Sequence, residues 1–295
     1  EVWEALADKN TKVIAQIAPA VRVAIGDHFG YAKGENVMGK LVGVLHRLGF
    51  DEVYDTSYGA DLTVVEESKE FIERFTSGQK MPLFTSCCPA WSMMAKKLFP
   101  DYANCISMAL TPMTLTARLI KKQHEKAKVV FIGPCAAKKL EAMRKSVRSE
   151  VDFVLTFEEL MGLFEAKAVN FADLPDNPED AFNSASADAR GFAASGGVAQ
   201  AVVNAIKKMD PDREVKVMSA QGLADCKKMM MMAKAGKYNG YLLEGMACPG
   251  GCIAGAGTLA DPAKSVAMLN KYKNEAAMKV ATETPYQDSL DLLHY

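Results

Sequence analysis

Short apolar runs alternate with stretches of helical periodicity along the chain. The Val, Ile and Ala run at 12–18 has the composition of a buried strand, and a helical pattern follows at 37–50. A second helical pattern covers 61–75. The sequence predicts seven strands, at 12–18, 52–55, 81–86, 129–133, 152–157, 216–222 and 240–246.

This alternation predicts an α/β fold with parallel sheets that are covered by helices on both faces. Ligands of such sheets bind beyond the carboxyl ends of the strands. Cys88, Cys135 and Cys248 each follow the end of a predicted strand. These three cysteines therefore indicate a functional site at that edge.

The strand pattern runs through two similar halves, and we expect lobes over approximately 1–125 and 126–261. Residues 174–186 are polar and rich in turn-forming residues, which predicts an exposed loop. Residues 262–295 are expected to form a C-terminal helix and a tail on the body. The methionine run 229–232 is expected to fill the core from a helix.

The composition is that of a globular protein, with 49% apolar and 24% charged residues among 295. A formal net charge of -1 gives no basic field for nucleic acid, and no apolar run reaches the roughly 18 residues that span a bilayer. The first residues lack the apolar segment of a secretory signal, so we expect a cytoplasmic protein without membrane insertion. The missing start methionine leaves open that the sequence is a fragment.

Seven cysteines require a chemical explanation, because an odd number at irregular spacing does not fit a disulfide framework. The segment CPGGCIAGAG carries Cys248 and Cys252, two thiolates that can coordinate one metal centre. Gly250 and Gly251 would let the backbone turn tightly around a bulky inorganic group, where a Cβ would collide. A glycine-rich turn with two buried cysteines is the alternative interpretation.

Two further segments each contribute a thiolate. TSCCPAW carries Cys87 and Cys88, and because adjacent residues leave a strand in opposite directions, the two are not expected to ligate one cluster together. GPCAAKKLE carries Cys135 and, one helical turn later, Lys138, whose ammonium group can donate to an anionic ligand. Outside this motif, Lys138 would be interpreted as a solvated helix lysine.

The cysteines that suit one 4Fe–4S cluster come from three strand ends: Cys88, Cys135, Cys248 and Cys252. Structural zinc is the competing interpretation, but zinc sites commonly use pairs of neighbouring cysteines rather than this distribution. The remaining Cys105 and Cys226 have no motif around them, and we expect both to be buried as small apolar residues.

Together, TSCCPAW, GPCAAKK and EGMACPGGCIAGAG resemble the signature segments of the catalytic, or H-cluster, domain of FeFe-hydrogenases. The resemblance is collinear from about residue 12 to 257, and the tail is compatible with it. It implies one H-cluster domain over 1–295, in which two lobes, each a small mainly parallel sheet flanked by helices, hold the cofactor in the cleft between them. The ferredoxin-like modules that commonly precede this domain do not occur in the sequence.

The resemblance also implies the cofactor and its surroundings. The four cysteines would hold the 4Fe–4S cluster, and Cys252 would bridge to a diiron subcluster with CO, cyanide and azadithiolate ligands. Lys138 would donate a hydrogen bond to one cyanide. The other residues implied to line the diiron unit are Ala18, Pro19, Ala20, Phe192 and Met246.

A proton route is implied in the same way. Cys87 matches the thiol that exchanges a proton with the azadithiolate amine, and the route continues through Glu67, Ser107, Glu70 and Arg74. From spacing alone, Glu67, Glu70 and Arg74 share one face of a predicted helix, where carboxylates can relay protons if burial raises their pKa. A surface ion pair between Glu70 and Arg74 is the alternative.

Four positions depart from the best-known hydrogen-evolving members. Gly133 stands where they usually carry methionine, Met113 where a glutamine is common, and Ala90 and Ala256 replace frequent glycines. These positions surround the diiron site without ligating it, so they bear on rate, catalytic bias and oxygen sensitivity. The expected partners are a ferredoxin or an accessory iron–sulfur domain or subunit for electrons, and dedicated hydrogenase maturation proteins.

Three functions are compatible with the resemblance. The leading hypothesis is an enzyme that reversibly reduces protons to H₂. The second is a hydrogen sensor with the same cofactor, a type that often loses the relay cysteine and carries a signalling module. The third is an iron–sulfur assembly protein, as among eukaryotic relatives. Because Cys87 is present and neither a signalling module nor added cysteine sites are visible, the sequence favours the enzyme.

Overall fold

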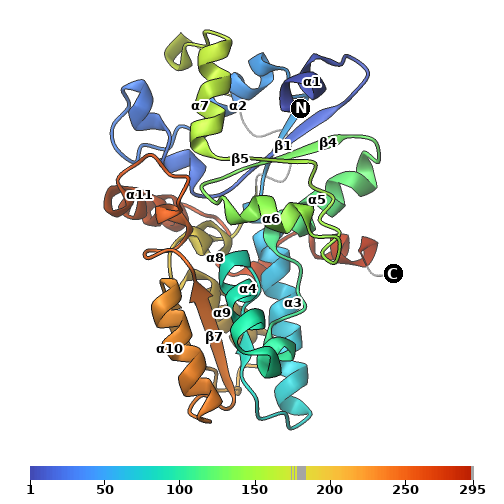
Figure 1. Cartoon of the computed structure of the whole chain (residues 1–295), viewed down its shortest axis with the longest axis vertical. Coiled ribbons are helices and arrows are strands. Elements are labelled where there is room, and N and C mark those ends of the chain that lie inside the picture. The colour runs from blue at the N-terminus through green and yellow to red at the C-terminus, as the bar shows by residue number, and fades with distance from the viewer. Residues whose placement is uncertain (174, 176, 178–183, 294–295) are drawn as a thin grey trace.

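A computed structural model describes residues 1–173, 175, 177 and 184–293 of the chain (Figure 1). The strands are β1 (Val13–Ile17), β2 (Glu52–Asp55), β3 (Leu83–Phe84), β4 (Lys128–Ile132), β5 (Phe153–Leu155), β6 (Lys216–Gln221) and β7 (Tyr241–Met246). The helices are α1 (Val2–Ala7), α2 (Met38–Leu48), α3 (Ser57–Thr76), α4 (Pro89–Leu98), α5 (Pro112–Gln123), α6 (Ala137–Met143), α7 (Phe157–Ala166), α8 (Ala187–Arg190), α9 (Gly197–Met209), α10 (Leu223–Lys234) and α11 (Pro262–Asn274). All seven predicted strands are present, and so are the predicted helices at 37–50, at 61–75 and within 262–295.

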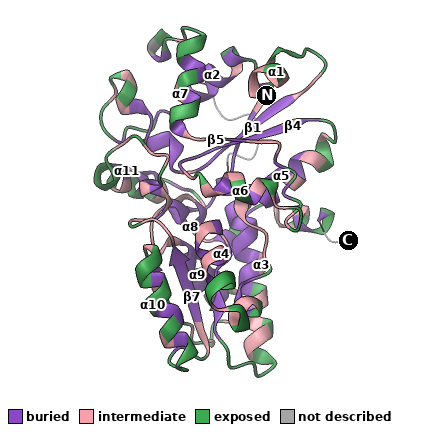
Figure 2. Cartoon of the chain, viewed as in Figure 1, coloured by how far each residue is buried: buried purple, intermediate pink, exposed green. Residues whose placement is uncertain are grey.

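The upper sheet in Figure 1 has the strand order β2-β1-β4-β5, and every neighbouring pair is parallel. In the register, Ala15 of β1 lies opposite Val53 of β2 and Val130 of β4. All five residues of β1 are buried, as a parallel strand covered on both faces requires. Figure 2 shows β1 and much of β4 in the colour of buried residues.

The lower sheet has the order β3-β7-β6 and is parallel as well. β7 occupies its centre and is buried at Leu242 and Leu243, whereas β6 forms one edge. With the upper sheet, this confirms the predicted α/β class of small parallel sheets flanked by helices.

The chain passes between the two sheets more than once, and the lobes expected over 1–125 and 126–261 do not correspond to them. β3 lies in the first half of the sequence but pairs with β7, and β4 and β5 lie in the second half but pair with β1 and with each other. The two sheets are therefore interleaved along the chain. Pairing between distant strands decides this arrangement, and the local apolar pattern carries no signal for it.

Helix α3 links the two sheets, since it starts directly after β2 of the upper sheet and packs against both α5 and α9. The C-terminal tail, expected on the body, covers the start of α3. There Tyr58 and Tyr286 meet edge to face with their ring centres 4.6 Å apart. Leu290 completes this apolar cluster.

Two smaller expectations have different outcomes. Of the predicted loop 174–186, residues 174, 176 and 178–183 lie outside the described residues. The methionine run belongs to α10, where Met229 and Met230 are buried, but Met231 is exposed. The core-filling interpretation is therefore wrong for Met231.

Among the described residues, no helix combines the length and apolar character that a membrane span requires.

A buried ion pair fixes the loop after β1 to the end of β2. Arg22 Nη2 lies 2.6 Å from Asp55 Oδ2, and both side chains are buried. The second Asp55 oxygen accepts a hydrogen bond from the Ser57 N–H at the start of α3, 2.8 Å away. The Arg22 guanidinium also lies over the ring of Tyr272 in α11, 4.3 Å from its centre. One pair thus orients β2, α3 and α11.

Replacement of Arg22 by methionine is expected to lower the free energy of unfolding by about 3–5 kcal/mol, because the Asp55 carboxylate stays buried without its counterion. The double variant Arg22→Met/Asp55→Asn should recover much of this loss, as urea denaturation would measure. Lys228→Met, which removes one partner of the exposed pair with Asp225, serves as the control with little effect. Equal losses in the single and double variants would contradict the electrostatic explanation.

Candidate metal centre

A cavity lies where the carboxyl ends of both sheets meet, and it encloses about 590 Å³ of empty space, part of it open to solvent. Segments that follow β1 and β4 contribute to one wall, and segments that follow β3 and β7 contribute to the other. The predicted site residues that line this cavity are Ala18, Pro19, Ala20, Cys87, Cys135, Lys138, Phe192, Met246 and Cys252. The structure therefore brings together residues that are up to 234 positions apart in the sequence.

Cys88 and Cys248 do not line the cavity themselves but lie beside it. Cys88 is buried at the start of α4, and its sulfur accepts a hydrogen bond from the Ala247 N–H, 3.4 Å away. Burial raises the pKa of Cys252, and the neighbouring Cys135 and Cys88 raise it further. Burial also raises the pKa of Cys248, again with Cys88 close enough to contribute. These mutual effects on pKa show that the four predicted ligands influence one another.

All seven cysteines are free thiols, and Cys105 and Cys226 are buried as expected. Within the described part of the chain, no three His, Cys, Asp or Glu side chains are gathered closely enough for a single metal ion. Four thiolates around a cubane cluster stand further apart than four around one ion. The preference for a cluster over zinc therefore stays a prediction from the distribution of the cysteines over three segments.

Glycines allow the loops that carry the cysteines to pack against each other. Gly251 has φ +89, and a Cβ there would lie 2.5 Å from the backbone nitrogen of Ser195. A Cβ on Gly255 would lie 2.3 Å from the carbonyl oxygen of Pro134, next to Cys135. The atoms that exclude a side chain at Gly251 therefore belong to the protein backbone, whereas the sequence had suggested the inorganic group.

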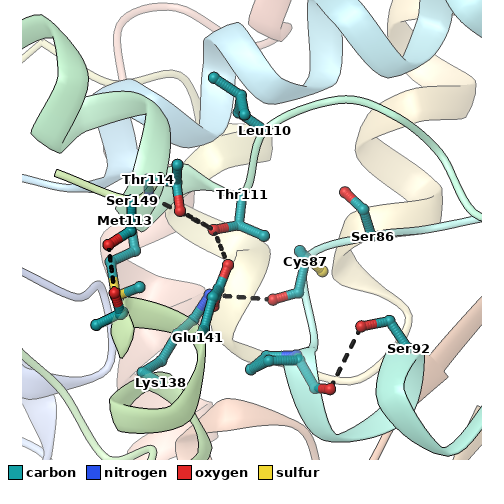
Figure 3. A network of polar contacts seen from close by, with 12 residues as sticks. Ser86, Cys87, Ser92, Leu110, Thr111, Met113, Thr114, Lys138, Glu141 and Ser149 are labelled. Atoms are coloured by element: carbon teal, nitrogen blue, oxygen red, sulfur yellow. Dashed lines mark hydrogen bonds and ion pairs between the residues drawn. The ribbon is translucent and has the colours of Figure 1, made fainter. Parts of the chain in front are cut away.

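Among the described residues that line the cavity, Lys138 is the only one with a positive charge. Its ammonium group donates to Glu141 Oε2 at 2.7 Å and to the Cys87 carbonyl at 3.3 Å (Figure 3). Although burial opposes a charge on Lys138, the Glu141 carboxylate outweighs it and raises the pKa of the lysine. Lys138 therefore remains positively charged beside the cavity.

Glu141 and Thr111 are residues of this site that the sequence analysis missed. Glu141 is buried, and its Oε1 accepts a hydrogen bond from Thr111 Oγ1 at 2.6 Å (Figure 3). The i,i+3 spacing of Lys138 and Glu141 on α6 was a signal that could have identified the pair. Nothing in the sequence around Thr111 indicates this contact.

Hydrogen bonds join some members of the predicted proton route to each other or to neighbours of the route. Glu67 Oε1 accepts a hydrogen bond from the Ser86 N–H at 3.0 Å, next to Cys87. Ser107 Oγ donates to Glu70 Oε2 at 2.6 Å, and Arg74 Nη2 lies 2.6 Å from Glu70 Oε1. The Glu70–Arg74 pair that was the alternative interpretation does exist, but it is also connected through Ser107 to the interior.

Burial dominates the protonation of this chain. It raises the pKa of Glu67 to about 8, and the neighbouring Glu70 adds to the effect. Glu67 Oε2 has no hydrogen-bond partner within the described residues, which leaves it able to accept or pass a proton. Desolvation, together with Glu67, also raises the pKa of Cys87 well above its usual value. Both groups therefore hold their protons near neutral pH.

Glu244 is a further buried acid that the sequence analysis missed. It lies on β7, and its two oxygens accept hydrogen bonds from the N–H groups of Gly196 and Ala199, each at 2.7 Å. These contacts cap the start of α9 and satisfy the carboxyl group. Glu244 nevertheless raises the pKa of Cys87 and Glu67. Its position inside a strand gave no signal for a cap.

This fold and this cavity define an α/β protein with two small parallel sheets and a cysteine-lined site where their strands end. The family described as "Iron only hydrogenase large subunit, C-terminal domain" matches residues 11–256. The chain belongs to this family, which confirms the resemblance noted from the motifs and implies an iron–sulfur cofactor.

Individual relatives are similar over most of the chain. "NADP-reducing hydrogenase subunit HndD" of Solidesulfovibrio fructosivorans is 36% identical over 87% of this chain and 52% of its own length, so the chain spans about half of that relative. The solved structure "apo [FeFe]-hydrogenase HydA1 from Chlamydomonas reinhardtii, variant C377H" superimposes on this chain with a TM-score of 0.81 and 28% sequence identity. The superposition covers 98% of this chain and 92% of that structure's chain.

The relatives also include proteins with a different role. "Cytosolic Fe-S cluster assembly factor narfl" of Danio rerio is 26% identical over 84% of this chain and 72% of its own length. The family therefore contains hydrogenases and iron–sulfur assembly factors.

The residues fit an iron–sulfur group of this family. Cys135 and Cys252 line the cavity, Cys88 and Cys248 are close enough to affect the pKa of Cys252, and thiolates are the ligands of such clusters. The cavity also offers one buried cation among mainly apolar side chains. Small side chains in the wall, such as those of Ala18 and Ala20, leave space in the cavity for a bound group.

Cys88→Ala is expected to prevent stable incorporation of the cluster, because it removes one thiolate of four and leaves the others in place. The measurement is iron content per chain after anaerobic reconstitution. Cys226→Ala is the matched control, since Cys226 is also buried but its thiol donates to the carbonyls of Ala220 and Met246 and does not line the cavity. Equal iron loading in Cys88→Ala and the wild type would refute the ligand assignment.

Glu67→Gln is expected to change how the stability of the metal-free protein depends on pH. Between about pH 4.5 and 8 the folded protein holds the Glu67 proton more tightly than the unfolded chain does, so stability falls as pH rises through this range. The amide removes this term, worth up to about a few kcal/mol. A smaller decline should remain, because burial also raises the pKa of Asp61 to about 7.

Denaturation midpoints at several pH values would measure this effect. The control is Glu73→Gln, on the exposed side of the same helix. Parallel pH profiles for the wild type and Glu67→Gln would contradict the assignment of a protonated, buried Glu67.

Proposed function

We propose that this chain is a hydrogenase that reversibly reduces protons to H₂ at an H-cluster. Cys88, Cys135, Cys248 and Cys252 would hold the 4Fe–4S cluster, and Cys252 would also bridge to a diiron subcluster with CO, cyanide and azadithiolate ligands. When bound, this group would pass electrons to and from the electron partner and supply the iron site at which protons and H₂ interconvert. The residues of the chain bind it, shield it and deliver protons.

One observation carries the proposal. A single cavity is lined by Cys87 and Lys138 together with the proposed ligands Cys135 and Cys252, while Glu67 is bonded to Ser86, next to Cys87, and Ser107 is bonded to Glu70. A cluster with a purely structural or storage role would need the four ligands but not a buried route for protons. The combination supports an enzyme over an assembly factor.

Lys138 would orient the anionic ligands of the diiron unit. Its positive charge is held by Glu141 on one side and faces the cavity on the other. Because the ammonium group is fixed by two acceptors, it offers its remaining donor in a defined direction. Phe192 and Met246 would exclude water from the same cavity.

Cys87 and the carboxyl chain would move protons between the cavity and bulk water. Cys87 Sγ holds the proton nearest the cavity, and Glu67 Oε2 is the group that can replace it. Glu67 would recover a proton through the Ser107 hydroxyl, which bonds Glu70. Arg74 holds the Glu70 carboxyl at the partly exposed end of the chain. A raised pKa at Glu67 keeps a proton available near neutral pH.

The proposal includes a ferredoxin or an accessory iron–sulfur domain or subunit as electron partner, and maturation proteins that supply the diiron unit. Infrared spectroscopy of anaerobically matured protein is the test of the cofactor. Bands of metal-bound CO and cyanide are expected. Their absence after maturation, with iron fully loaded, would contradict the proposal and favour the assembly role. Intact bands with only slow turnover would favour the hydrogen sensor.

Cys87→Ala is expected to keep the infrared bands and to lower hydrogen turnover about a hundredfold or more, since alanine fits the space but cannot exchange a proton. Glu67→Gln should have a similar effect. Cys105→Ala, which lies outside the cavity lining, is the control for loss of a buried thiol. Near-wild-type turnover in Cys87→Ala would place the proton route elsewhere, and loss of the 4Fe–4S cluster would show that Cys87 and Cys88 have exchanged roles.

A further inference from the structure

Helix α10 carries a stripe of apolar and basic side chains on its outer side. Leu223, Lys227, Met231 and Lys234 follow one another at spacings of three and four residues, so they share one face of the helix. Leu223 is 44% exposed and Met231 is 54% exposed, although the buried side of the same helix is filled by Met229 and Met230. The packing of α10 against the lower sheet does not require these two exposed side chains.

The strand beside this helix is also incompletely covered. Val217 and Met218 of β6 are 36% and 38% exposed, whereas their partners Leu242 and Leu243 on β7 are fully buried. Consecutive strand residues point to opposite faces, so both faces are partly open at this edge. Natural parallel sheets are normally covered on both faces. We call Val217, Met218, Leu223, Lys227, Met231 and Lys234 the β6–α10 surface.

The charge of this region is opposite to that of the rest of the chain. Residues 216–237 contain five lysines and one aspartate, a net charge of +4, although the whole chain has a net charge of -1. Lys227 and Lys234 are exposed. Exposed apolar residues rimmed by like charges are typical of a surface that binds a partner of the opposite charge.

The β6–α10 surface adjoins the loop that contains Cys248. The Gly222 N–H, just before α10, donates to the Met246 carbonyl at 2.8 Å. The Gly250 N–H donates to Gln221 Oε1, at the end of β6, at 2.6 Å. A Cβ placed on Gly222 would lie 3.7 Å from the ring of Pro249. A protein docked here would therefore come close to the proposed ligand Cys248.

We infer that the β6–α10 surface docks an acidic iron–sulfur electron carrier, which passes electrons by way of the Cys248 loop; this rests on the proposed function. The apolar residues would form the contact area, and the lysines would attract and orient the carrier. Helix α11 is the rival location, since it lies against the residues after Cys252 and exposes Lys264 and Lys271. α11 has no exposed large apolar side chain among its described residues, which favours α10.

The test is calorimetric titration of the 4Fe–4S-reconstituted chain with an oxidised, acidic bacterial-type ferredoxin. K227E/K234E should weaken the Kd by about tenfold or more at low ionic strength, and K264E/K271E, with the same change in charge, by less than about twofold. Met231→Ser should weaken it by about threefold or more. Binding by the wild type should decrease as ionic strength rises. Unchanged thermal midpoints of the variants would confirm that they fold.

Several results would overturn the inference. These are an equal or greater loss in K264E/K271E, no effect of K227E/K234E, no ferredoxin binding by the wild type, or self-association of the wild type that Met231→Ser abolishes, which would identify a second copy as the occupant. Hydrogen evolution by the anaerobically matured chain, driven by reduced methyl viologen, is measured separately, because it needs no docked protein. Its absence beside intact ferredoxin binding would refute the proposed function and leave the docking surface standing.

Discussion

Both parallel sheets direct their carboxyl ends at one cavity, and every feature of the candidate site depends on this constraint. Residues beyond β1 and β4 meet residues beyond β3 and β7 there, with Ala18 and Cys135 on one side and Cys87 and Met246 on the other. Helix α3 maintains the arrangement, because it starts at the end of β2 and packs against both α5 and α9. A change in the angle between the sheets would separate the ligands before it disturbed either core.

The electrostatics of the cavity follow from the same enclosure. Burial raises the pKa of Cys135, Cys248 and Cys252, so these thiols keep their protons without metal, and cluster binding must release protons. Lys138 is the one cation close to these sulfurs in the described cavity wall, and Glu141 keeps it charged. A metal centre would therefore stabilise the ionised thiolates, and the buried lysine would offset part of the added negative charge.

Local signals in the sequence predicted the elements and most of the residues that line the cavity. The apolar runs identified every strand, and the helical period placed Glu67, Glu70 and Arg74 on one face. The interleaving of the sheets was not predictable in this way, because β3 is only two residues long and its partner β7 lies far along the chain. Glu244 was missed for a related reason, since its role comes from a cap that forms only in the folded chain. Glu141 was missed although its i,i+3 spacing to Lys138 was visible, and only its contact with Thr111 depends on another segment.

The two proposals together assign protons and electrons to opposite sides of the lower lobe. The proton contacts follow α3 to Arg74, whereas the β6–α10 surface lies beside the Cys248 loop, and Figure 1 shows α3 and α10 on either side of β7. A docked carrier at α10 would not cover Arg74 or displace the water that must exchange protons with Glu70. It would also exclude water near Cys248, where a lower local dielectric strengthens the attraction between the lysines and an acidic partner. Protons and electrons would therefore reach the cavity by separate routes, the protons along the polar groups of α3 and the electrons through the docked carrier and the Cys248 loop.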